Sequence, residues 1–594
     1  MKSVRAWAPD LATEPLREGI ETERAQSGET TARVQGVYLH SRYRPREEAA
    51  RLIDDAGLSS IVRAVLVVGI GCGYHVAELI ARGYRVTIFE PDRCVAKIAI
   101  ESALADSDVM LAIGDPDQLI ADSDFLKLTR ADLQILVHPP TERLHPEVVA
   151  AVRRHVASIQ IVSKSLSVAV VGPMYGGSLP IASYLARAFE HLGHRTLFVD
   201  TSDAWDLYQR VTGTVRSKNA SGQLGSLLAN VLEQWAYAQV AEFAPNICIV
   251  MAQAPVGPSF PARLCKENIV SAFWFVENWR HMPYWRQVCR EYDCFFHLQP
   301  GEFELKLEEA GCRRHTLVQT GCDPDVHKPV ELSHADQNEF GCEVAFAGAG
   351  YNNRSQFLLG LTDYHLRIWG TEWNARELQP FLSHPEERFT PETFAKIVAG
   401  ASINLNLHSS ATHSGVDPRC DAVNPRVFEI AACGGFQICD PCNGLSNFFD
   451  FESELPVYRD LKQCRTLIDH FLKAPDERRV LADNARNRAL REHTYTHRAQ
   501  QMLDNLTSLF AGQMLAKGVR VQRTVSEMAE RAGKESPLGR YLSTLPPNTL
   551  FSQTALNNFI PVMGTPLSHP EGVFAYLREL RTSAEQLLAL FDGA

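Results

Sequence analysis

The sequence predicts an α/β protein with three consecutive α/β units, an N-terminal arm and a helical tail. Its 594 residues leave room for about four domains at roughly 150 residues each. Short apolar runs alternate with helix-like segments, which indicates parallel sheets. Two of the units begin with an apolar strand that enters a glycine-rich turn and a helix. A Pro-containing linker then separates the second unit from the third.

The overall composition is typical of a globular protein and argues against several other classes of protein. Hydrophobic residues make up 45% of the chain and charged residues 22%, an ordinary globular balance. A net charge of −11 gives no overall basic field for nucleic acid or an anionic membrane. We find no uncharged apolar run long enough to span a membrane, and no apolar segment of a signal peptide at the start. The fourteen cysteines are therefore expected to be free thiols in a reducing cytoplasm.

The first unit is expected at residues 36–165, after a flexible arm at 1–35 that is polar and lacks periodicity. Its first strand and helix are expected at 64–71 and 75–82. Later strands of this unit are expected at 84–90, 133–139 and 158–162.

The second and third units are expected at 166–330 and 331–510. Strands of the second unit are expected to start at 166 and to include 195–200, 247–252, 269–276, 294–299 and the stretch after 315. Strands of the third are expected at 343–349, 365–370, 402–408, 435–440 and 455–460, and its helices near 461–473 and 476–508. The tail, 511–594, should be mostly helical, with a helix-like stretch at 572–591.

Two α/β halves on one linker predict a ligand-binding cleft. In open parallel sheets, ligands bind at the carboxyl ends of the strands. Two such sheets that face each other could hold a donor and an acceptor between them.

Six segments of the third unit occur in an order that resembles the C-terminal half of CgeB-like (spore-maturation-protein-type) GT-B glycosyltransferases. They are "VAFAGAGYNNRSQFL", "LRIWGTEW", "INLNLHSS", "NPRVFEIAACGGFQICD", "VYRDLKQCRTLI" and "HTYTHRAQQML". In retaining GT-B enzymes, "R-x-x-E-x-x-A-x-G" opens the helix whose Glu binds the nucleotide ribose. The resemblance implies that Glu429 is this ligand, with Asn424, Arg426 and Gly348 in the same nucleotide-sugar site. Asp421 stands eight positions upstream, where family enzymes often carry another acidic residue; here it is Asp and not Glu.

Two further resemblances extend the assignment towards the N-terminus. "LVQTGCDPDVHKPV" is similar to the linker between GT-B domains, with His327 in the aromatic position. "YLHSRYRPREEAARLI" and "VLVVGIGCGYHVAELIARGYRVTIFEPD" resemble the N-terminal region of motility-associated (Maf-type) bacterial flagellin glycosyltransferases. Together the resemblances imply a GT-B pair of Rossmann-like domains behind an extra N-terminal Rossmann-like domain.

The glycine turn of the first unit is a nucleoside signature. The glycines around Gly71 let a ligand approach the backbone, and Glu90 ends the next strand, where a carboxylate can take a ribose diol. The stretch also resembles the first βαβ of S-adenosylmethionine methyltransferases. Methyl transfer, nucleotide binding without catalysis, and a tight turn in a structural domain remain open.

Several other side chains are candidates for the cleft. Gly176 and Gly177 could offer backbone N–H groups to a phosphate or a sugar hydroxyl. Arg354 and Arg426 could stabilise a departing diphosphate, or could be a loop arginine and a structural ion-pair partner. His408 and Glu277 follow strands, and we predict catalytic roles for Glu277, His408 and Arg354, with Glu277 an acceptor ligand or general base. The alternatives are a satisfied strand-end histidine and an acidic residue at a helix start.

No metal site is predicted. Asp323 and Asp325 form a D-x-D pattern, but it falls in the linker. Cys439 and Cys442 form a C-x-x-C pair, and a zinc site would need a second ligand pair that the spacing does not reveal.

We therefore predict a cytoplasmic, metal-independent glycosyltransferase without a tightly bound cofactor. It would use a nucleotide-sugar donor and a hydroxyl of a protein, flagellin included, or of a surface glycan, and retention is favoured. A homo-oligomer is left open. The alternatives are a methyltransferase acting through residues 65–140 and a non-catalytic nucleotide- or glycan-binding scaffold.

Overall fold

In a computed structural model, the chain forms two compact units. The first comprises residues 1–164 with 506–521, and the second 165–505 with 522–594. The structure describes residues 2–58, 64–105, 107–116, 133–162, 164–384, 389–518, 520–521, 524–547, 549, 551, 556, 559 and 568–575. Within this part of the chain, every helix is too short or too polar to cross a membrane.

A five-stranded sheet with the strand order β1-β7-β6-β5-β8 is the centre of the first unit. Its strands are β1 (Lys2–Ser3), β5 (Ala64–Val68), β6 (Arg85–Glu90), β7 (Met110–Ile113) and β8 (Leu133–Val137). β5 is buried along its whole length, as expected of a parallel strand with helices on both faces. The helices are α1 (Val4–Ala12), α2 (Pro45–Asp55), α3 (Tyr74–Ala81), α4 (Arg93–Ala99), α7 (Pro139–Leu144) and α8 (Pro146–Val162).

The prediction of a flexible arm at residues 1–35 is wrong. β1 pairs antiparallel with β7, and α1 buries Val4 and Leu11 in the core of the unit. Residues further on form a small antiparallel sheet of β2 (Ile20–Arg24), β3 (Thr30–Val34) and β4 (Val37–Tyr38). The arm looked polar because α1 has a single narrow apolar stripe, which is enough to dock it. The strand expected at 158–162 is also wrong, since these residues end α8.

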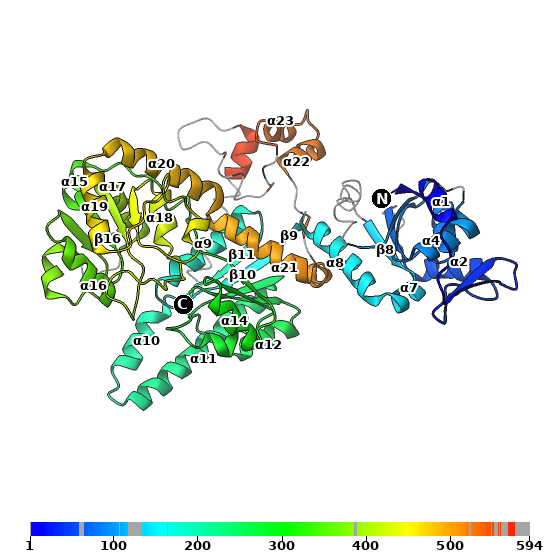
Figure 1. Ribbon diagram of the computed structural model, residues 1–594, viewed down its shortest axis with the longest axis horizontal. Helices are drawn as coiled ribbons and strands as arrows, with labels where there is room; N and C mark the ends of the chain where they lie inside the picture. Colours follow the sequence, from blue (N-terminus) through cyan, green and yellow to red (C-terminus); the bar gives the residue numbers. More distant parts are fainter. Residues whose placement is uncertain are drawn as a thin grey trace. The chain divides into compact units, whose positions relative to one another are not determined.

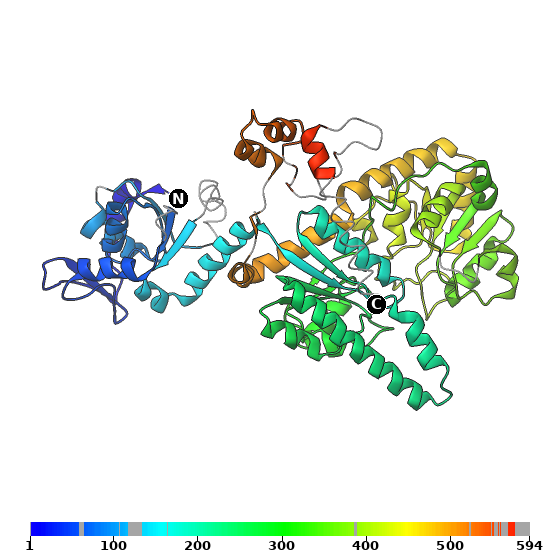
Figure 2. The ribbon, with the colours of Figure 1, turned by 180° about the vertical axis from the view of Figure 1, so that it is seen from behind.

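The second unit begins with a six-stranded parallel sheet in the order β11-β10-β12-β13-β14-β15. Its strands are β10 (Ser167–Val171), β11 (Arg195–Val199), β12 (Ile247–Met251), β13 (Val270–Phe275), β14 (Cys294–His297) and β15 (His315–Leu317). Its main helices are α9 (Ser178–His191), α10 (Ala204–Gly213), α11 (Lys218–Phe243), α12 (Ser259–Lys266) and α14 (Glu302–Glu309). α10 and α11 form a hairpin that projects from this half in both views (Figures 1 and 2).

A five-stranded parallel sheet, β18-β17-β16-β19-β20, forms the other half of this unit. Its strands are β16 (Cys342–Ala347), β17 (Leu366–Trp369), β18 (Leu382–Ser383), β19 (Ala401–Asn406) and β20 (Gln437–Cys439). Its helices are α15 (His334–Phe340), α16 (Asn352–Leu358), α17 (Pro391–Gly400), α18 (Arg426–Ala432), α19 (Leu461–Leu472) and α20 (Pro475–Glu492). The strand expected at 455–460 reduces to one bridge between Val457 and Cys439.

The two halves are tied together by more than the linker. The single helix expected at 476–508 is broken after α20, and α21 (Tyr495–Lys517) starts anew. Gln501 on α21 donates to the carbonyl of Leu317 at 3.0 Å, so the chain returns from the second half to the first. In the linker, Asp323 accepts from Arg187 of α9 at 2.9 Å.

The described part of the tail contains two short helices, α22 (Val525–Ala532) and α23 (Pro537–Ser543), which share a small core. Most of the helix expected at 572–591 lies outside the described residues. The helical character predicted for the tail is thus present in α22 and α23.

Candidate functional site

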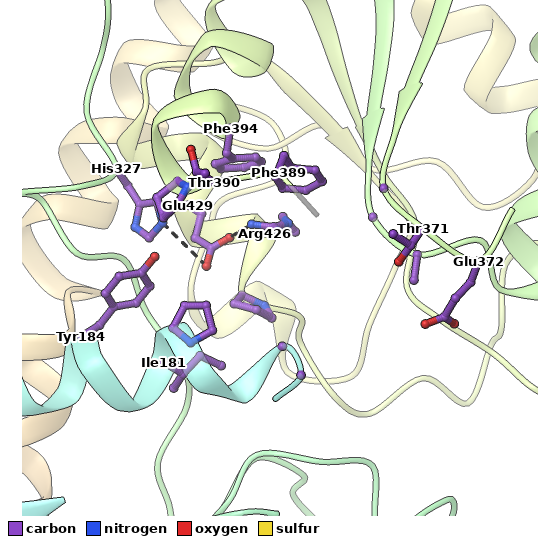
Figure 3. A pocket seen from close by; sticks show the side chains of 18 of the residues that line it. Ile181, Tyr184, His327, Thr371, Glu372, Phe389, Thr390, Phe394, Arg426 and Glu429 are labelled. Carbon is purple, nitrogen blue, oxygen red and sulfur yellow. Dashed lines mark hydrogen bonds and ion pairs between the residues drawn. The ribbon is translucent and has the colours of Figure 1, made fainter. Parts of the chain in front are cut away.

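A pocket of about 310 Å³ lies between the two halves of the second unit. The first half contributes the start of α9. The second half contributes the turns after β16 and β17, the segment before α17 and the start of α18. In Figure 3, His327, Arg426 and Glu429 gather on one side, and Thr371 and Glu372 lie on the other. The pocket is therefore built from residues that are up to about 250 positions apart in the sequence.

Glu429 is the central carboxylate of this pocket. It lies on α18, which begins after Pro425 and is followed by Gly434 with a left-handed backbone (φ +77°). The predicted helix, its glycine end and the strand after it are thereby confirmed. The Glu429 side chain is only 6% exposed. Oε2 accepts from the Arg426 guanidinium, and Oε1 lies 3.8 Å from His327 Nε2, beyond hydrogen-bonding distance.

His327 is held as a neutral imidazole with its proton on Nε2. Its Nδ1 accepts the backbone N–H of Asp323 at 3.0 Å, so the ring proton must be on the nitrogen that faces Glu429. Burial lowers the pKa of His327, which keeps the ring uncharged near neutral pH. Tyr184 of α9 packs edge-on against this ring, and burial raises the pKa of its hydroxyl. This side of the pocket therefore offers neutral donors beside the carboxylate.

Arg426 is the cation of the pocket. Its guanidinium lies over the rings of Phe394, at 4.3 Å, and Phe389, at 5.2 Å. The side chain remains 32% exposed. Stacking on two aromatic rings and pairing with Glu429 hold the guanidinium in place, while its open side can receive an anion.

Glycines from both halves also line the pocket. Gly176 has a left-handed backbone (φ +104°), and with Gly177 it leads into the fourteen-residue α9, whose first N–H groups lie at the pocket. Gly348 and Gly370 bring two turns together, because a Cβ on Gly370 would stand 2.2 Å from the Gly348 carbonyl oxygen. Side chains are thus excluded where a ligand can approach the backbone.

Three other predicted site residues lie outside the pocket lining. Arg354 is half-buried; its Nε donates to the Leu407 carbonyl at 2.9 Å and its guanidinium also donates to the Ala349 carbonyl at 3.1 Å. Burial lowers its pKa to about 10. Asn424 exchanges side-chain hydrogen bonds with Asn406. His408 is buried against Asp440. These contacts position loops and do not face the ligand.

Glu277 and Asp421 also lie away from the lining. Glu277 follows β13, and burial raises its pKa to about 7. Asp421 is buried and accepts from Arg280 of the first half at 2.7 Å. This ion pair joins the two halves, which accounts for an acidic residue at that position.

In the first unit, the groups that we expected to bind a nucleoside contact other parts of the protein instead. Glu90 is buried, and its two oxygens accept the backbone N–H groups of Ile70, at 2.7 Å, and Asp92, at 2.9 Å. Burial raises its pKa to about 8. A Cβ on Gly71 would stand 2.7 Å from His40 Nε2. In this structure Glu90 therefore stabilises the glycine turn, and His40 fills the approach that we predicted for a ligand.

Sequence reasoning missed the aromatic part of the pocket. Tyr184, Phe389 and Phe394 line it together with Thr371 and Glu372. The phenylalanines follow no motif, and α9 reads as an ordinary amphipathic helix. The one available signal was the aromatic position of the linker, where His327 stands.

Parts of this chain are similar to known proteins. Residues 354–504 match the family described as "Glycosyl transferase-like". An uncharacterized protein of Treponema pallidum (strain Nichols) is 48% identical over 72 residues, which are 11% of this chain and 25% of that protein. The alignment thus spans about a quarter of that relative's length.

Solved structures with a similar fold are much more distant in sequence. Sucrose-phosphate synthase from Thermosynechococcus elongatus is 12% identical, with a TM-score of 0.42 over 58% of this chain and 100% of that one. HepE from Anabaena, in complex with UDP and glucose, is 11% identical, with a TM-score of 0.40 over 58% of this chain and 100% of that one. Residues 354–504 are thus similar to a glycosyl transferase-like family, and the two facing α/β halves have a GT-B type of architecture.

Proposed function

We propose that this protein transfers a sugar from a nucleoside-diphosphate sugar, held between the two halves of the second unit, to a hydroxyl of a protein or glycan. The observation that carries the proposal is the Arg426–Glu429 pair, which faces a pocket formed by both halves. A carboxylate for hydroxyls and a guanidinium for an anion are the two groups that a ribose diphosphate requires.

Each group has a place in this scheme. Glu429 Oε1, which has no hydrogen bond to His327, accepts from the ribose hydroxyls. The Arg426 guanidinium and the N–H groups at the start of α9 bind the diphosphate and stabilise the negative charge that grows on it as it leaves. The acceptor oxygen forms a bond to the anomeric carbon as the bond from that carbon to the diphosphate breaks. Glu277 follows β13 outside the pocket lining and has its pKa raised to about 7, and we propose it as the base for an acceptor that binds beside the pocket.

Transfer in this scheme is metal-independent. Of the described residues that line the pocket, Glu372 and Glu429 are the carboxylates, and they lie on opposite sides of it (Figure 3). Glu429 already pairs with Arg426. A divalent cation on the diphosphate would find no pair of carboxylates, whereas a guanidinium and a helix start are in place.

The proposed acceptor and the proposed stereochemical outcome are based on the resemblance to known families. The similarity of the first unit to Maf-type proteins favours flagellin as the acceptor and the cytoplasm as the compartment. The "R-x-x-E-x-x-A-x-G" segment favours retention of the anomeric configuration. The anomer of the product, read by NMR, tests retention.

A thermal-shift panel of the five common nucleoside diphosphates tests the proposal. A ligand that binds only the native state adds about 2.7 kcal/mol of stability at 100 times its dissociation constant. We expect one or two of the diphosphates to raise the melting temperature of the native protein, and Arg426→Ala to abolish the rise. The corresponding nucleotide sugar should then label an acceptor. Failure of all five to bind, or binding that Arg426→Ala leaves unchanged, would overturn the proposal.

A further inference from the structure

We propose that His408, Cys420 and Cys442 form a structural zinc site that holds the loop between β19 and α18. The three side chains come from three places: His408 follows β19, Cys420 lies in the loop, and Cys442 follows β20. Their ligand atoms all lie within 4.8 Å of one another, and the two sulfurs are 3.5 Å apart. Both cysteines are free thiols in this structure.

His408 is oriented as a metal ligand. Its Nδ1 lies 2.7 Å from Asp440 Oδ1, and the same oxygen accepts the His408 backbone N–H at 2.9 Å. The ring is 2% exposed, and its Nε2 has no hydrogen-bond partner among the described residues. A carboxylate on one ring nitrogen, with the other nitrogen left without a hydrogen bond and so available to a metal, is the usual arrangement of a zinc-bound histidine.

The alternative of an ordinary buried cluster leaves its polar atoms poorly satisfied. A buried nitrogen without a partner costs about 1–3 kcal/mol. The sulfurs have only weak contacts: the Cys420 thiol with the Cys442 sulfur at 3.5 Å and with the Ala422 carbonyl at 3.9 Å, and the Cys442 thiol with the Asn443 carbonyl at 3.7 Å. One metal ion would satisfy all three side chains at once.

Ligand chemistry selects zinc. Two thiolates and one imidazole suit this borderline-soft ion, and two sulfurs bound to one tetrahedral zinc at about 2.3 Å lie about 3.8 Å apart, close to the spacing found here. Binding would release one proton from each thiol, and the two thiolates would neutralise the charge of Zn²⁺. Cys420 is partly exposed, which gives a water molecule access to the fourth position.

The site would organise the pocket without touching the donor. Residues 407–425 contain no helix or strand, and this loop carries Asp421, the partner of Arg280, and leads directly to Arg426. None of the three ligands lines the pocket. The metal would therefore fix the path of the loop that positions α18. This inference does not depend on the proposed function.

Cobalt titration of the full-length protein tests the site directly. The protein is reduced, stripped of metal with a chelator and titrated with Co²⁺. We expect one thiolate-to-cobalt charge-transfer band that saturates at one ion per chain, and stoichiometric displacement by Zn²⁺. Cys420→Ser and Cys442→Ser should each weaken the band and lower the apparent zinc affinity at least tenfold. Cys265→Ser, which changes an exposed thiol outside the cluster, should alter neither.

Three results would overturn the inference. The first is the absence of a charge-transfer band in the native protein, which needs no variant and so does not depend on how well variants fold. The second is a band that persists in the Cys420→Ser/Cys442→Ser double variant. The third is a Cys420–Cys442 disulfide that is present in the isolated protein and persists under reducing conditions, detected as two missing thiols. Nucleoside-diphosphate binding, measured on the same samples, reports the proposed function separately.

Discussion

Glu429→Gln is the change that best separates a ligand-binding role from a structural one. The substitution keeps the shape of the side chain and removes its charge. Hydrogen bonds to a charged acceptor are worth about 1.5–3 kcal/mol, roughly twice as much as neutral ones. In the structure one carboxylate oxygen is taken by Arg426, so Oε1 is left for one or two ribose hydroxyls. Loss of the charge should cost about 1.4 kcal/mol, a tenfold decrease in affinity for the nucleoside diphosphate.

The same change should have a small effect on stability. The amide oxygen of Gln can still accept from Arg426, which is 32% exposed and rests on Phe394 and Phe389. Exposed ion pairs typically contribute about 0–1 kcal/mol, and because Gln keeps the hydrogen bond to Arg426 we expect a loss in that range. We therefore expect the melting temperature to fall by no more than about 2–4 °C.

Asp323→Asn is the matched control. Asp323 and its partner Arg187 are 4% and 35% exposed, close to the 6% and 32% of Glu429 and Arg426, but neither lines the pocket. The control should lose similar stability and bind the nucleotide like the native protein. Calorimetric titration and a melting curve on each purified variant supply both quantities.

A double-mutant cycle with the ligand locates the contact. If Glu429 binds the ribose, the 2′- or 3′-deoxy diphosphate should bind less tightly than the ribonucleotide to the native protein, and the penalty should shrink in Glu429→Gln. A Glu429→Gln variant that unfolds earlier than Asp323→Asn but binds the nucleotide with native affinity would refute the reasoning. Glu429 would then be a fold-stabilising partner of Arg426.

Three further predictions concern other parts of the chain. Burial raises the pKa of Glu277 to about 7 from 4.5, so its protonated form is favoured in the folded state. The free energy of unfolding of the native protein should therefore fall as pH rises between these values. In urea unfolding, Glu277→Gln should show no such fall and should be up to about 3 kcal/mol more stable than the native protein above pH 8. Parallel pH profiles for the two proteins would contradict this. Gly71→Ala should lower the melting temperature of the first unit more than Gly57→Ala does. Both glycines have a positive φ, but only at Gly71 would the added Cβ meet other atoms within 4 Å. Equal losses would count against the packing argument. Leu11→Ala should lower the free energy of unfolding of the first unit by about 2–5 kcal/mol, since Leu11 is buried in its core. Leu16→Ala, at an exposed position, should have no such effect. Native stability in the Leu11→Ala variant would mean that α1 is not docked.

Much of the architecture could be read from local sequence. Uninterrupted apolar runs such as 64–68 and 247–251 mark buried parallel strands, and a glycine past the end of α18 marks its stop. Glu429 could be placed because the helix and its neighbours Arg426 and Gly434 are consecutive in the chain. Local patterns failed where apolar character alone was used, as at 158–162, which continues α8 because nothing there interrupts the helix.

Tertiary structure decided which polar groups remain available to a ligand. Glu90 and Arg354 carry the right chemistry for a site, but their hydrogen bonds go to backbone groups that only folding brings close. The Arg280–Asp421 pair spans 141 positions, and Cys420 meets Cys442 across 22. A sequence pattern reports the type of a side chain and its spacing, whereas the partners of a buried group depend on which loops two sheets place at the same edge. For that reason the sequence by itself determined the fold class and the position of α18, and only the folded chain determined the pocket and the cysteine–histidine cluster.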